Sequence, residues 1–294
     1  MLTRRNLLAA TAATPLSAAT GRMFLCMHQT TSAGSTFRAS LAGYARAGIR
    51  YVEITLPMIA EFVKTGTIAD ARRIMTDLGL TAASFGGVRG LAEPHAGRAQ
   101  AIEELKRTAE LVAELGIDRL VCPCGTTEKF TSDDYARGAG NLREAGEIVK
   151  PLGITAMLEF MRGSTFVGTL PTALRLTRQA AHSNVRPMFD CYHFWAGLSK
   201  FEDLELLHSA EIHHVHFQDV PDMPREQLDN STRDIPGDGV SPLVRILSKL
   251  AEKNYRGPVS VELFYPHLQK GDPYEVALRI RHKAEPILQQ AGVL

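Results

Sequence analysis

The chain has 294 residues, of which 45% are hydrophobic and 22% charged, and its 33 basic and 32 acidic residues leave a net charge of +1. These values exclude a disordered, collagen-like or coiled-coil chain, and the charge balance gives no reason to expect a nucleic acid or an anionic membrane as the partner. No stretch reaches the ~18 uninterrupted apolar residues of a membrane span.

Residues 1–22 contain the three parts of an export signal in order. Arg4 and Arg5 precede a mildly apolar Ala/Thr/Leu run, and residues 17–19 (SAA) offer small side chains where a signal peptidase can cleave. The segment resembles a twin-arginine signal, which exports folded proteins, and it predicts a periplasmic or otherwise exported protein. The alternative is a short extension of a cytoplasmic protein. We therefore treat residues 23–294 as the folded body.

Eight short apolar runs recur along this body, and a longer segment with helical periodicity follows each of them. The predicted strands are residues 23–27, 50–54, 81–85, 119–123, 154–160, 185–190, 212–217 and 258–264. Their spacing suits βα units, which need about 30 residues, and nearly continuous apolar strands are typical of a parallel sheet covered by helices. Eight such units predict a single-domain α/β fold, the (β/α)8 TIM barrel, rather than an open doubly wound sheet.

Two of the intervening segments show the helical pattern in detail. In residues 98–115 the apolar side chains fall near one face, and Gly116 follows as a C-terminal stop. In residues 241–253, Ser241 is a candidate N-cap and Pro242 suits the first helical position. No Gly/Ser linker or dinucleotide-binding fingerprint divides the chain.

The four cysteines each lie in or directly after a predicted strand; they are Cys26, Cys122, Cys124 and Cys191. We expect them to be small buried hydrophobic residues. Cys122 and Cys124 lack the two-residue spacer of common zinc or redox pairs, so their spacing does not favour a metal site. A disulfide is compatible with an exported protein, but a chain of this length does not need one.

Four ionisable residues lie at or near the ends of four consecutive predicted strands; they are Glu159, Asp190, His216 and Glu262. In a TIM barrel the C-terminal strand ends surround the active site. Three carboxylates packed together repel one another, and a divalent cation removes that penalty. The alternative, a structural ion-pair network, lacks matching basic residues at these strand ends. Carboxylate oxygens and one imidazole suit one divalent ion, with Mn²⁺ preferred over Mg²⁺, Co²⁺ or Zn²⁺.

Other residues near the strand ends are candidates for substrate contacts. Glu53 ends the second predicted strand and His28 follows the first, so both can line the pocket mouth or serve a structural role. Trp195 can form an apolar wall beside a sugar, or it can pack against a helix. Side chains on a strand alternate, so His214 should lie one layer below His216 as a hydrogen-bonded core residue.

The runs LEF, MFDCYH, HVHFQD, R-x-x-PGDG and SVELF, in this order, resemble the xylose isomerase-like barrel family of sugar phosphate isomerases and epimerases. That family includes ketose 3-epimerases, hydroxypyruvate isomerases and inosose dehydratases, with endonuclease IV as a distant relative. The resemblance covers the whole body and is strongest from residue 154 onward. It implies that the four strand-end residues are metal ligands, and that His193 and Arg233 contact the substrate. Their alternative roles are a partner of Asp190 and a surface arginine.

The ligand set predicts enolisation chemistry. A divalent ion that chelates the carbonyl and the neighbouring hydroxyl of an α-hydroxy ketone stabilises the enediolate that forms when the α-proton leaves. Glu159 and Glu262 are expected to act as base and acid on its two faces, which gives an isomerase or epimerase acting on a keto-sugar. Loss of a β-hydroxyl from the same intermediate gives a dehydratase acting on a keto-cyclitol or a 3-keto-glycoside.

Two further classes of function remain as weaker alternatives. A nuclease of the endonuclease IV type needs extra histidines from the third and fourth strands, where FGG and CPCG stand. A non-catalytic sugar-binding barrel has no need of a metal flanked by two potential bases. We therefore expect a small carbohydrate as the partner, with no nucleic acid, and a homo-oligomer is compatible with the sequence.

Overall fold

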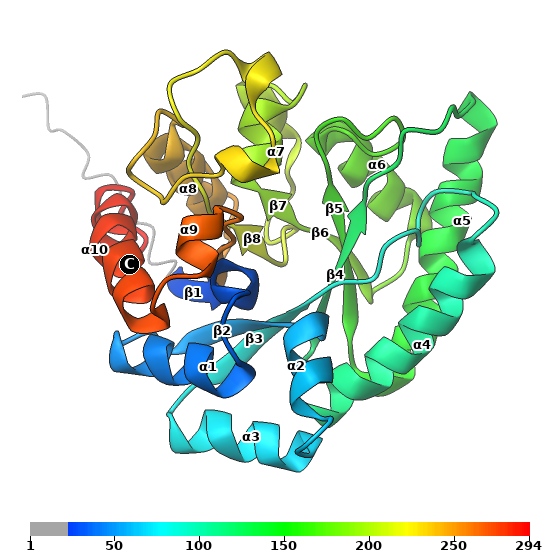
Figure 1. Ribbon diagram of the computed structural model, residues 1–294. Coiled ribbons are helices and arrows are strands. Elements are labelled where there is room, and N and C mark those ends of the chain that lie inside the picture. The colour runs from blue at the N-terminus through cyan, green and yellow to red at the C-terminus, as the bar shows by residue number, and fades with distance from the viewer. Residues whose placement is uncertain (1–22) are drawn as a thin grey trace, which may run out of the picture.

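A computed structural model describes residues 23–294 as a nearly closed parallel barrel with helices around it (Figure 1). The strands are β1 Phe24–His28, β2 Tyr51–Thr55, β3 Thr81–Gly86, β4 Arg119–Cys124, β5 Thr155–Phe160, β6 Val185–Pro187, β7 Phe189–Asp190, β8 Val215–His216 and β9 Pro258–Val261. Their order in the sheet is β6-β5-β4-β3-β2-β1-β9-β8-β7. The predicted (β/α)8 TIM barrel is confirmed, whereas the predicted signal at residues 1–22 lies outside the described residues.

The sixth barrel strand consists of two short pieces, β6 and β7, which only Met188 separates. β6 pairs with β5, and β7 pairs with β8. The backbone N–H of Met188 donates to the carbonyl of Leu158 at 3.0 Å, so this strand pairs with β5 up to Met188. After Met188 it pairs with β8 instead. The barrel therefore comes close to closing through this one strand.

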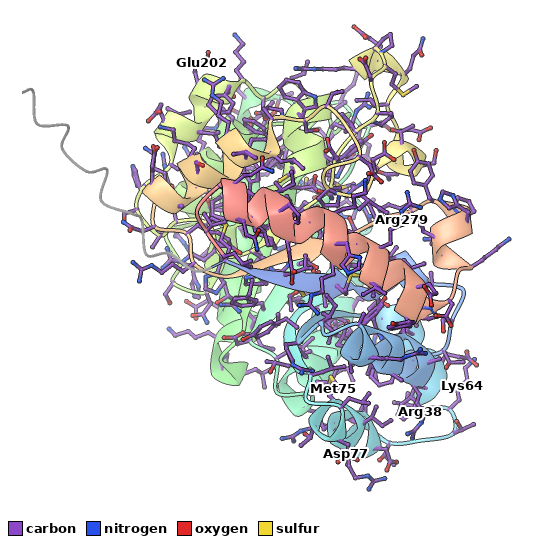
Figure 2. The ribbon with its side chains drawn as sticks, turned by 90° about the vertical axis from the view of Figure 1, so that its left-hand side faces the viewer. Arg38, Lys64, Met75, Asp77, Glu202 and Arg279 are labelled. Carbon is purple, nitrogen blue, oxygen red and sulfur yellow. The ribbon has the colours of Figure 1, made fainter. Side chains whose placement is uncertain are left out.

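Helices cover the outside of the barrel (Figure 1). They are α1 Phe37–Arg46, α2 Leu56–Phe62, α3 Ile68–Asp77, α4 Arg98–Glu114, α5 Ser132–Val149, α6 Leu170–Ala180, α7 Cys191–Ala196, α8 Leu243–Glu252, α9 Pro266–Gln269 and α10 Pro273–Gln290. The last helix, α10, packs against α1 and so joins the two ends of the barrel. Charged side chains such as Lys64, Asp77 and Glu202 project from this outer layer (Figure 2). Within residues 23–294, no helix is both long enough and apolar enough to cross a membrane.

The two helices analysed from the sequence begin and end close to their predicted limits. α4 stops before Gly116, which has the left-handed φ of +78° that glycine adopts freely. α8 starts later than predicted, and Ser241 is not its N-cap. The backbone N–H of Ser241 donates to Asp219 Oδ1 at 2.8 Å, and Pro242 takes the cap position without a side-chain bond. The apolar stripe is buried as expected at Leu243, Ile246, Leu247 and Leu250.

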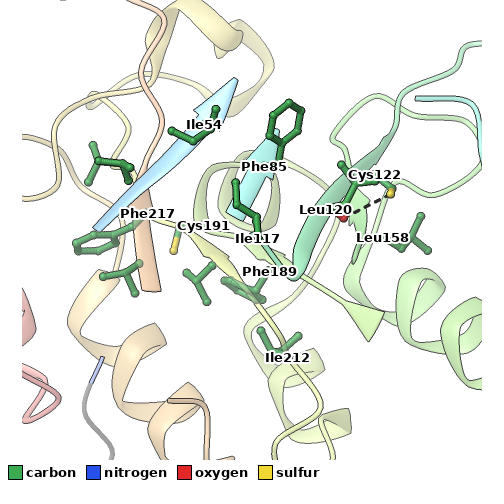
Figure 3. Packing of buried hydrophobic residues seen from close by; sticks show 14 of the residues in the cluster. Ile54, Phe85, Ile117, Leu120, Cys122, Leu158, Phe189, Cys191, Ile212 and Phe217 are labelled. Atoms are coloured by element: carbon green, nitrogen blue, oxygen red, sulfur yellow. Dashed lines mark hydrogen bonds between the residues drawn. The ribbon is translucent and has the colours of Figure 1, made fainter. Parts of the chain in front are cut away.

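Apolar side chains fill the interior of the barrel and the layer beneath the helices (Figure 3). Ile54, Phe85 and Phe189 are fully buried there. All four cysteines are buried and free, as predicted. Cys122 Sγ lies 3.5 Å from the carbonyl oxygen of its neighbour Leu120 (Figure 3). Polar side chains such as Ser84 and Ser260 are also fully buried in the barrel, and ionisable residues gather at the C-terminal strand ends.

Candidate metal centre

Four side chains from consecutive strands meet at the C-terminal end of the barrel. Glu159 is the penultimate residue of β5, Asp190 ends β7, His216 ends β8 and Glu262 directly follows β9. His216 Nδ1 lies 3.3 Å from Glu159 Oε1, 3.4 Å from Asp190 Oδ2 and 3.5 Å from Glu262 Oε2. The structure thus brings together the four residues that the sequence suggested as ligands.

The central nitrogen of this group, His216 Nδ1, is buried and has no hydrogen-bond partner among residues 23–294. The other ring nitrogen, Nε2, lies 3.3 Å from Glu53 Oε1. A carboxylate only accepts, so Nε2 donates, and whenever the ring is neutral its Nδ1 lone pair faces three carboxylate oxygens. Such an arrangement is unfavourable unless a cation or protons lie among these atoms. The donor set therefore fits a divalent cation.

When no metal is bound, protons reduce part of the repulsion between these carboxylates. Burial raises the pKa of Glu159 to about 7, and the nearby Asp190 and Glu262 act in the same direction. Burial would lower the pKa of His216, but Glu53, Glu262 and the other two carboxylates raise it well above its usual value. Protons on Glu159 and His216 therefore reduce the repulsion when no metal is bound. A metal ion and these protons compete for the same atoms.

A buried arginine holds the other two carboxylates in place. Arg233 Nη1 lies 3.0 Å from Asp190 Oδ2 and 2.6 Å from Glu262 Oε2. Asp190 also accepts from Gln218 Nε2 at 2.9 Å and from the backbone N–H of His193 at 2.6 Å. Burial would raise both carboxyl pKa values, but Arg233 holds the pKa of Asp190 well below its usual range and that of Glu262 below it. Arg233 is only 2% exposed, which excludes the surface-arginine alternative.

A cavity of about 350 Å³ opens above these residues. Glu159, His216 and Glu262 line it, and so do His28, His193 and Arg233. Gly87 lets the loop after β3 approach β4, because a Cβ at this position would overlap the carbonyl oxygen of Val121. The cavity therefore places charged and polar side chains next to the four candidate ligands.

Each ring nitrogen of His193 lies close to an N–H group of another residue. Its Nδ1 lies 3.1 Å from the backbone nitrogen of Arg162, and its Nε2 lies 3.0 Å from Arg233 Nη2. Burial lowers the pKa of His193 to about 3, so the ring is neutral and carries one proton. The one proton of the neutral ring lies on Nδ1 or on Nε2, so the ring accepts from one of these two donors at a time. Arg233 and His193 therefore position each other in the cavity wall.

His28 is a second neutral donor in the cavity wall. Its Nδ1 accepts the backbone N–H of Thr30 at 3.1 Å, so Nε2 carries the proton. That nitrogen lies 3.5 Å from Glu262 Oε1 and 3.5 Å from Glu53 Oε1. Burial lowers the pKa of His28 and keeps the ring uncharged. A substrate hydroxyl is a suitable acceptor for its Nε2–H.

Glu53 lies below the cavity and not at its mouth. β2 continues two residues further, so Thr55 lines the cavity while Glu53 is fully buried. Its Oε2 accepts from His214 Nε2 at 2.8 Å, and its Oε1 faces His216 Nε2. Burial would raise the pKa of Glu53, but His28 and these two histidines hold it well below its usual value. Glu53 therefore orients histidines from beneath, and His214 is the buried, hydrogen-bonded residue that was expected.

Trp195 faces away from the cavity. α7 places residues two apart at about 200° around the helix axis, and His193 faces the cavity, so Trp195 points outward. Its ring packs under Arg225, whose guanidinium carbon lies 3.8 Å from the ring centroid. Trp195 therefore has a packing role and does not form the expected wall beside a sugar. The cavity's aromatic wall comes instead from Phe264, which the alternation of SVELF from Glu262 could have indicated.

Comparisons with known proteins agree with this architecture. The family described as "Xylose isomerase-like TIM barrel" matches residues 41–284. An inosose isomerase from Halalkalibacterium halodurans is 33% identical over 254 residues, which cover 83% of this chain and 89% of that protein. A 3-dehydroshikimate dehydratase from Pseudomonas aeruginosa is 29% identical over 240 residues, which cover 80% of this chain and 37% of that protein. A solved structure of the IOLI protein with a bound zinc atom shares the fold, with a TM-score of 0.86, 24% identity, and coverage of 92% of this chain and 99% of that one.

Proposed function

The chain belongs to the xylose isomerase-like TIM barrel family, and we propose that it is a divalent-metal-dependent isomerase or epimerase acting on a keto-sugar or a related α-hydroxy ketone. Its sequence relatives are enzymes that act on sugar-like molecules. The observation that carries the proposal is the buried Nδ1 of His216, which has no hydrogen-bond partner in residues 23–294 and lies 3.3–3.5 Å from three carboxylate oxygens beside a cavity. Glu159, Asp190, His216 and Glu262 would hold the ion.

The ion would polarise the substrate carbonyl and stabilise negative charge on the adjacent oxygens. Mn²⁺ remains the expected ion because oxygen-rich ligand sets suit it, and the zinc of the IOLI structure supports Zn²⁺ as the alternative. Two of the four ligands, Glu159 and Glu262, would also transfer protons, and other side chains of the cavity would position the substrate.

Two carboxyl groups with different proton affinities are available for proton transfer. Burial raises the pKa of Glu159 to about 7 in the metal-free protein, and a bound ion would displace this proton and leave Glu159 ionised as a proton acceptor. Glu262 is kept ionised by Arg233 and can accept a proton. Such a pair suits acid–base chemistry on one substrate. Because β7 and β8 lie between β5 and β9 on one side of the barrel, the two groups should approach the substrate from different sides.

The neighbouring donors position the substrate. His193 and Arg233, which hydrogen-bond to each other at 3.0 Å, line the cavity and offer polar groups to the oxygens of a substrate. His28 Nε2–H supplies a donor beside Glu262. Phe264 offers an apolar face against the carbon skeleton. These contacts hold the α-carbon near the two carboxyl groups, which is what a proton transfer between its faces requires.

A dehydratase is the second candidate. The same α-proton removal leads to elimination when the substrate carries a hydroxyl β to its carbonyl, and the similarity to a 3-dehydroshikimate dehydratase supports this branch. An endonuclease IV-type site has less support, because β3 and β4 present Gly86, Gly87 and Pro123 to the cavity in place of histidines.

Solvent exchange of the α-proton tests the proposal. The Mn²⁺-loaded protein is incubated in D₂O with a panel of keto-sugars and keto-cyclitols, and proton loss and product formation are followed by NMR. We expect exchange or epimerised product with at least one substrate, and loss of this activity with Asp190→Ala. An unsaturated product would favour the dehydratase. Inactivity toward every substrate in the panel, with metal bound, would contradict both branches.

A further inference from the structure

We propose that Arg89, at the rim of the cavity, binds an anionic substituent of the substrate, either a carboxylate or a phosphate. This inference rests on the proposed function and narrows its substrate class to acidic keto-sugars or their phosphate esters. The anion would lie at the end of the substrate that points away from the metal ligands.

The guanidinium of Arg89 has no carboxylate partner among the described residues. Arg89 follows β3, is exposed and lines the cavity. Its one side-chain contact of hydrogen-bond type is from Nη1 to Met161 Sδ at 3.4 Å, and a thioether is a weak acceptor. The five donors of the guanidinium are therefore largely free for a ligand.

Arg233, the other arginine that lines the cavity, is not free in this way. Its guanidinium bonds to Asp190 and Glu262, and it is almost fully buried. His28 and His193 are kept neutral by burial. Arg89 is thus the cavity-lining cation, within residues 23–294, whose charge no carboxylate neutralises.

Gly125 leaves space for the side chains of Arg89 and Met161. A Cβ on Gly125 would lie 3.2 Å from Arg89 Nη1 and 2.9 Å from Met161 Sδ, so the glycine leaves room for both groups. Arg89 and Gly125 follow β3 and β4. His193 and Arg233 follow β7 and β8, on the other side of the barrel. A substrate held between them can extend one end toward Arg89.

A guanidinium is well suited to this role. Its planar fork binds carboxylate and phosphate groups with two parallel hydrogen bonds, which a lysine cannot do. Charge-assisted bonds of this kind typically change affinity by about tenfold to a hundredfold. The hydroxyls of a neutral sugar accept weaker hydrogen bonds from the same residue, so Arg89 should favour anionic over neutral substrates.

The test compares three probes that differ in one substituent: a neutral hexulose, the same hexulose 6-phosphate, and the corresponding hexuluronate. Their dissociation constants are measured by calorimetry on the Mn²⁺-loaded protein, on Arg89→Gln, on Arg89→Lys and on Arg72→Gln. Arg72 is an exposed arginine of α3 outside the cavity and serves as the matched control. Phosphate can also ligate the metal directly, so the difference between the parent and Arg89→Gln is the quantity that decides.

We expect one anionic probe to bind the parent about tenfold to a hundredfold more tightly than the neutral hexulose. Arg89→Gln should remove this preference, Arg89→Lys should keep part of it, and Arg72→Gln should retain it in full. The anion that shows the preference identifies the substituent. Equal binding of all three probes to the parent, or an unchanged preference in Arg89→Gln, would overturn the inference.

The outcome is separate from that of the proposed function. A protein that exchanges the α-proton of a neutral keto-sugar but shows no preference dependent on Arg89 refutes this inference alone. A protein that shows the preference but exchanges no α-proton refutes the proposed function alone.

Discussion

Replacing Glu53 with glutamine should weaken metal binding, although Glu53 lies behind His216 and not among the groups that face the ion. Glu53 accepts from His216 Nε2 at 3.3 Å and from His214 Nε2 at 2.8 Å. The first contact places the His216 proton on Nε2 and leaves Nδ1 available to a metal. A glutamine has one acceptor oxygen and one NH₂ donor, so it cannot serve both rings as the carboxylate does. If its NH₂ turns toward His216, the ring must carry its proton on Nδ1.

The expected loss of Mn²⁺ affinity is about 10–100-fold, the usual effect of removing the carboxylate behind a ligating histidine. This loss corresponds to about 1.4–2.8 kcal/mol. Affinity is measured at neutral pH by competition with a fluorescent chelator. Ser84→Ala is the matched control, because Ser84 Oγ contacts His214 Nε2 at 3.3 Å but not His216. Unchanged affinity in a folded Glu53→Gln protein would refute this account of the histidine's orientation.

Three further predictions concern proton transfer, pH and export. Glu159→Gln and Glu262→Gln should each lower turnover about 10²–10⁴-fold while the metal stays bound, as measured by steady-state rates and metal analysis. Near-normal turnover in both variants would refute a two-carboxylate mechanism. Loss of turnover in only one of them would favour a single base. Mn²⁺ affinity should fall as the pH drops through 7, because burial raises the pKa of Glu159 to about 7 and the carboxylates raise the pKa of His216 well above its usual value, so its proton competes with the ion at higher pH as well. The ion displaces these protons, so Mn²⁺ titrations at several pH values should show binding up to about tenfold weaker per pH unit for each displaced proton. An Mn²⁺ affinity that does not change with pH would contradict the competition between metal and protons. Replacing Arg4 and Arg5 with lysine should retain the protein in the cytoplasm, as measured by cell fractionation; equal periplasmic yield, or no periplasmic protein from the unaltered chain, would count against export.

The barrel and its main cluster could be predicted because both depend on local pattern. Each apolar run is long enough to specify a strand, and each strand end is identifiable from a few residues. Parallel strands in a barrel have their C-terminal ends at one edge, so Glu159, Asp190, His216 and Glu262 had to lie near one another. The alternation of side chains along β8 likewise placed His214 beneath His216.

The features that were missed depend on contacts between distant segments or on exact strand ends. Glu53 seemed to end its strand, but β2 runs on to Thr55 and leaves the carboxylate buried beneath histidines more than 160 residues away. Ser241 is not the N-cap of α8, because the helix begins one residue later than expected and Pro242 takes the cap position. The position of Arg89 beside Met161 likewise depends on the pairing of whole strands. No local pattern encodes these partners.

Anomalous scattering from crystals grown with Mn²⁺ tests the central claim most directly. We predict one strong peak within about 2.0–2.4 Å of His216 Nδ1 and of carboxylate oxygens of Glu159, Asp190 and Glu262. A peak bound by other residues, or none between these four side chains at saturating Mn²⁺, would contradict the assignment of the metal centre.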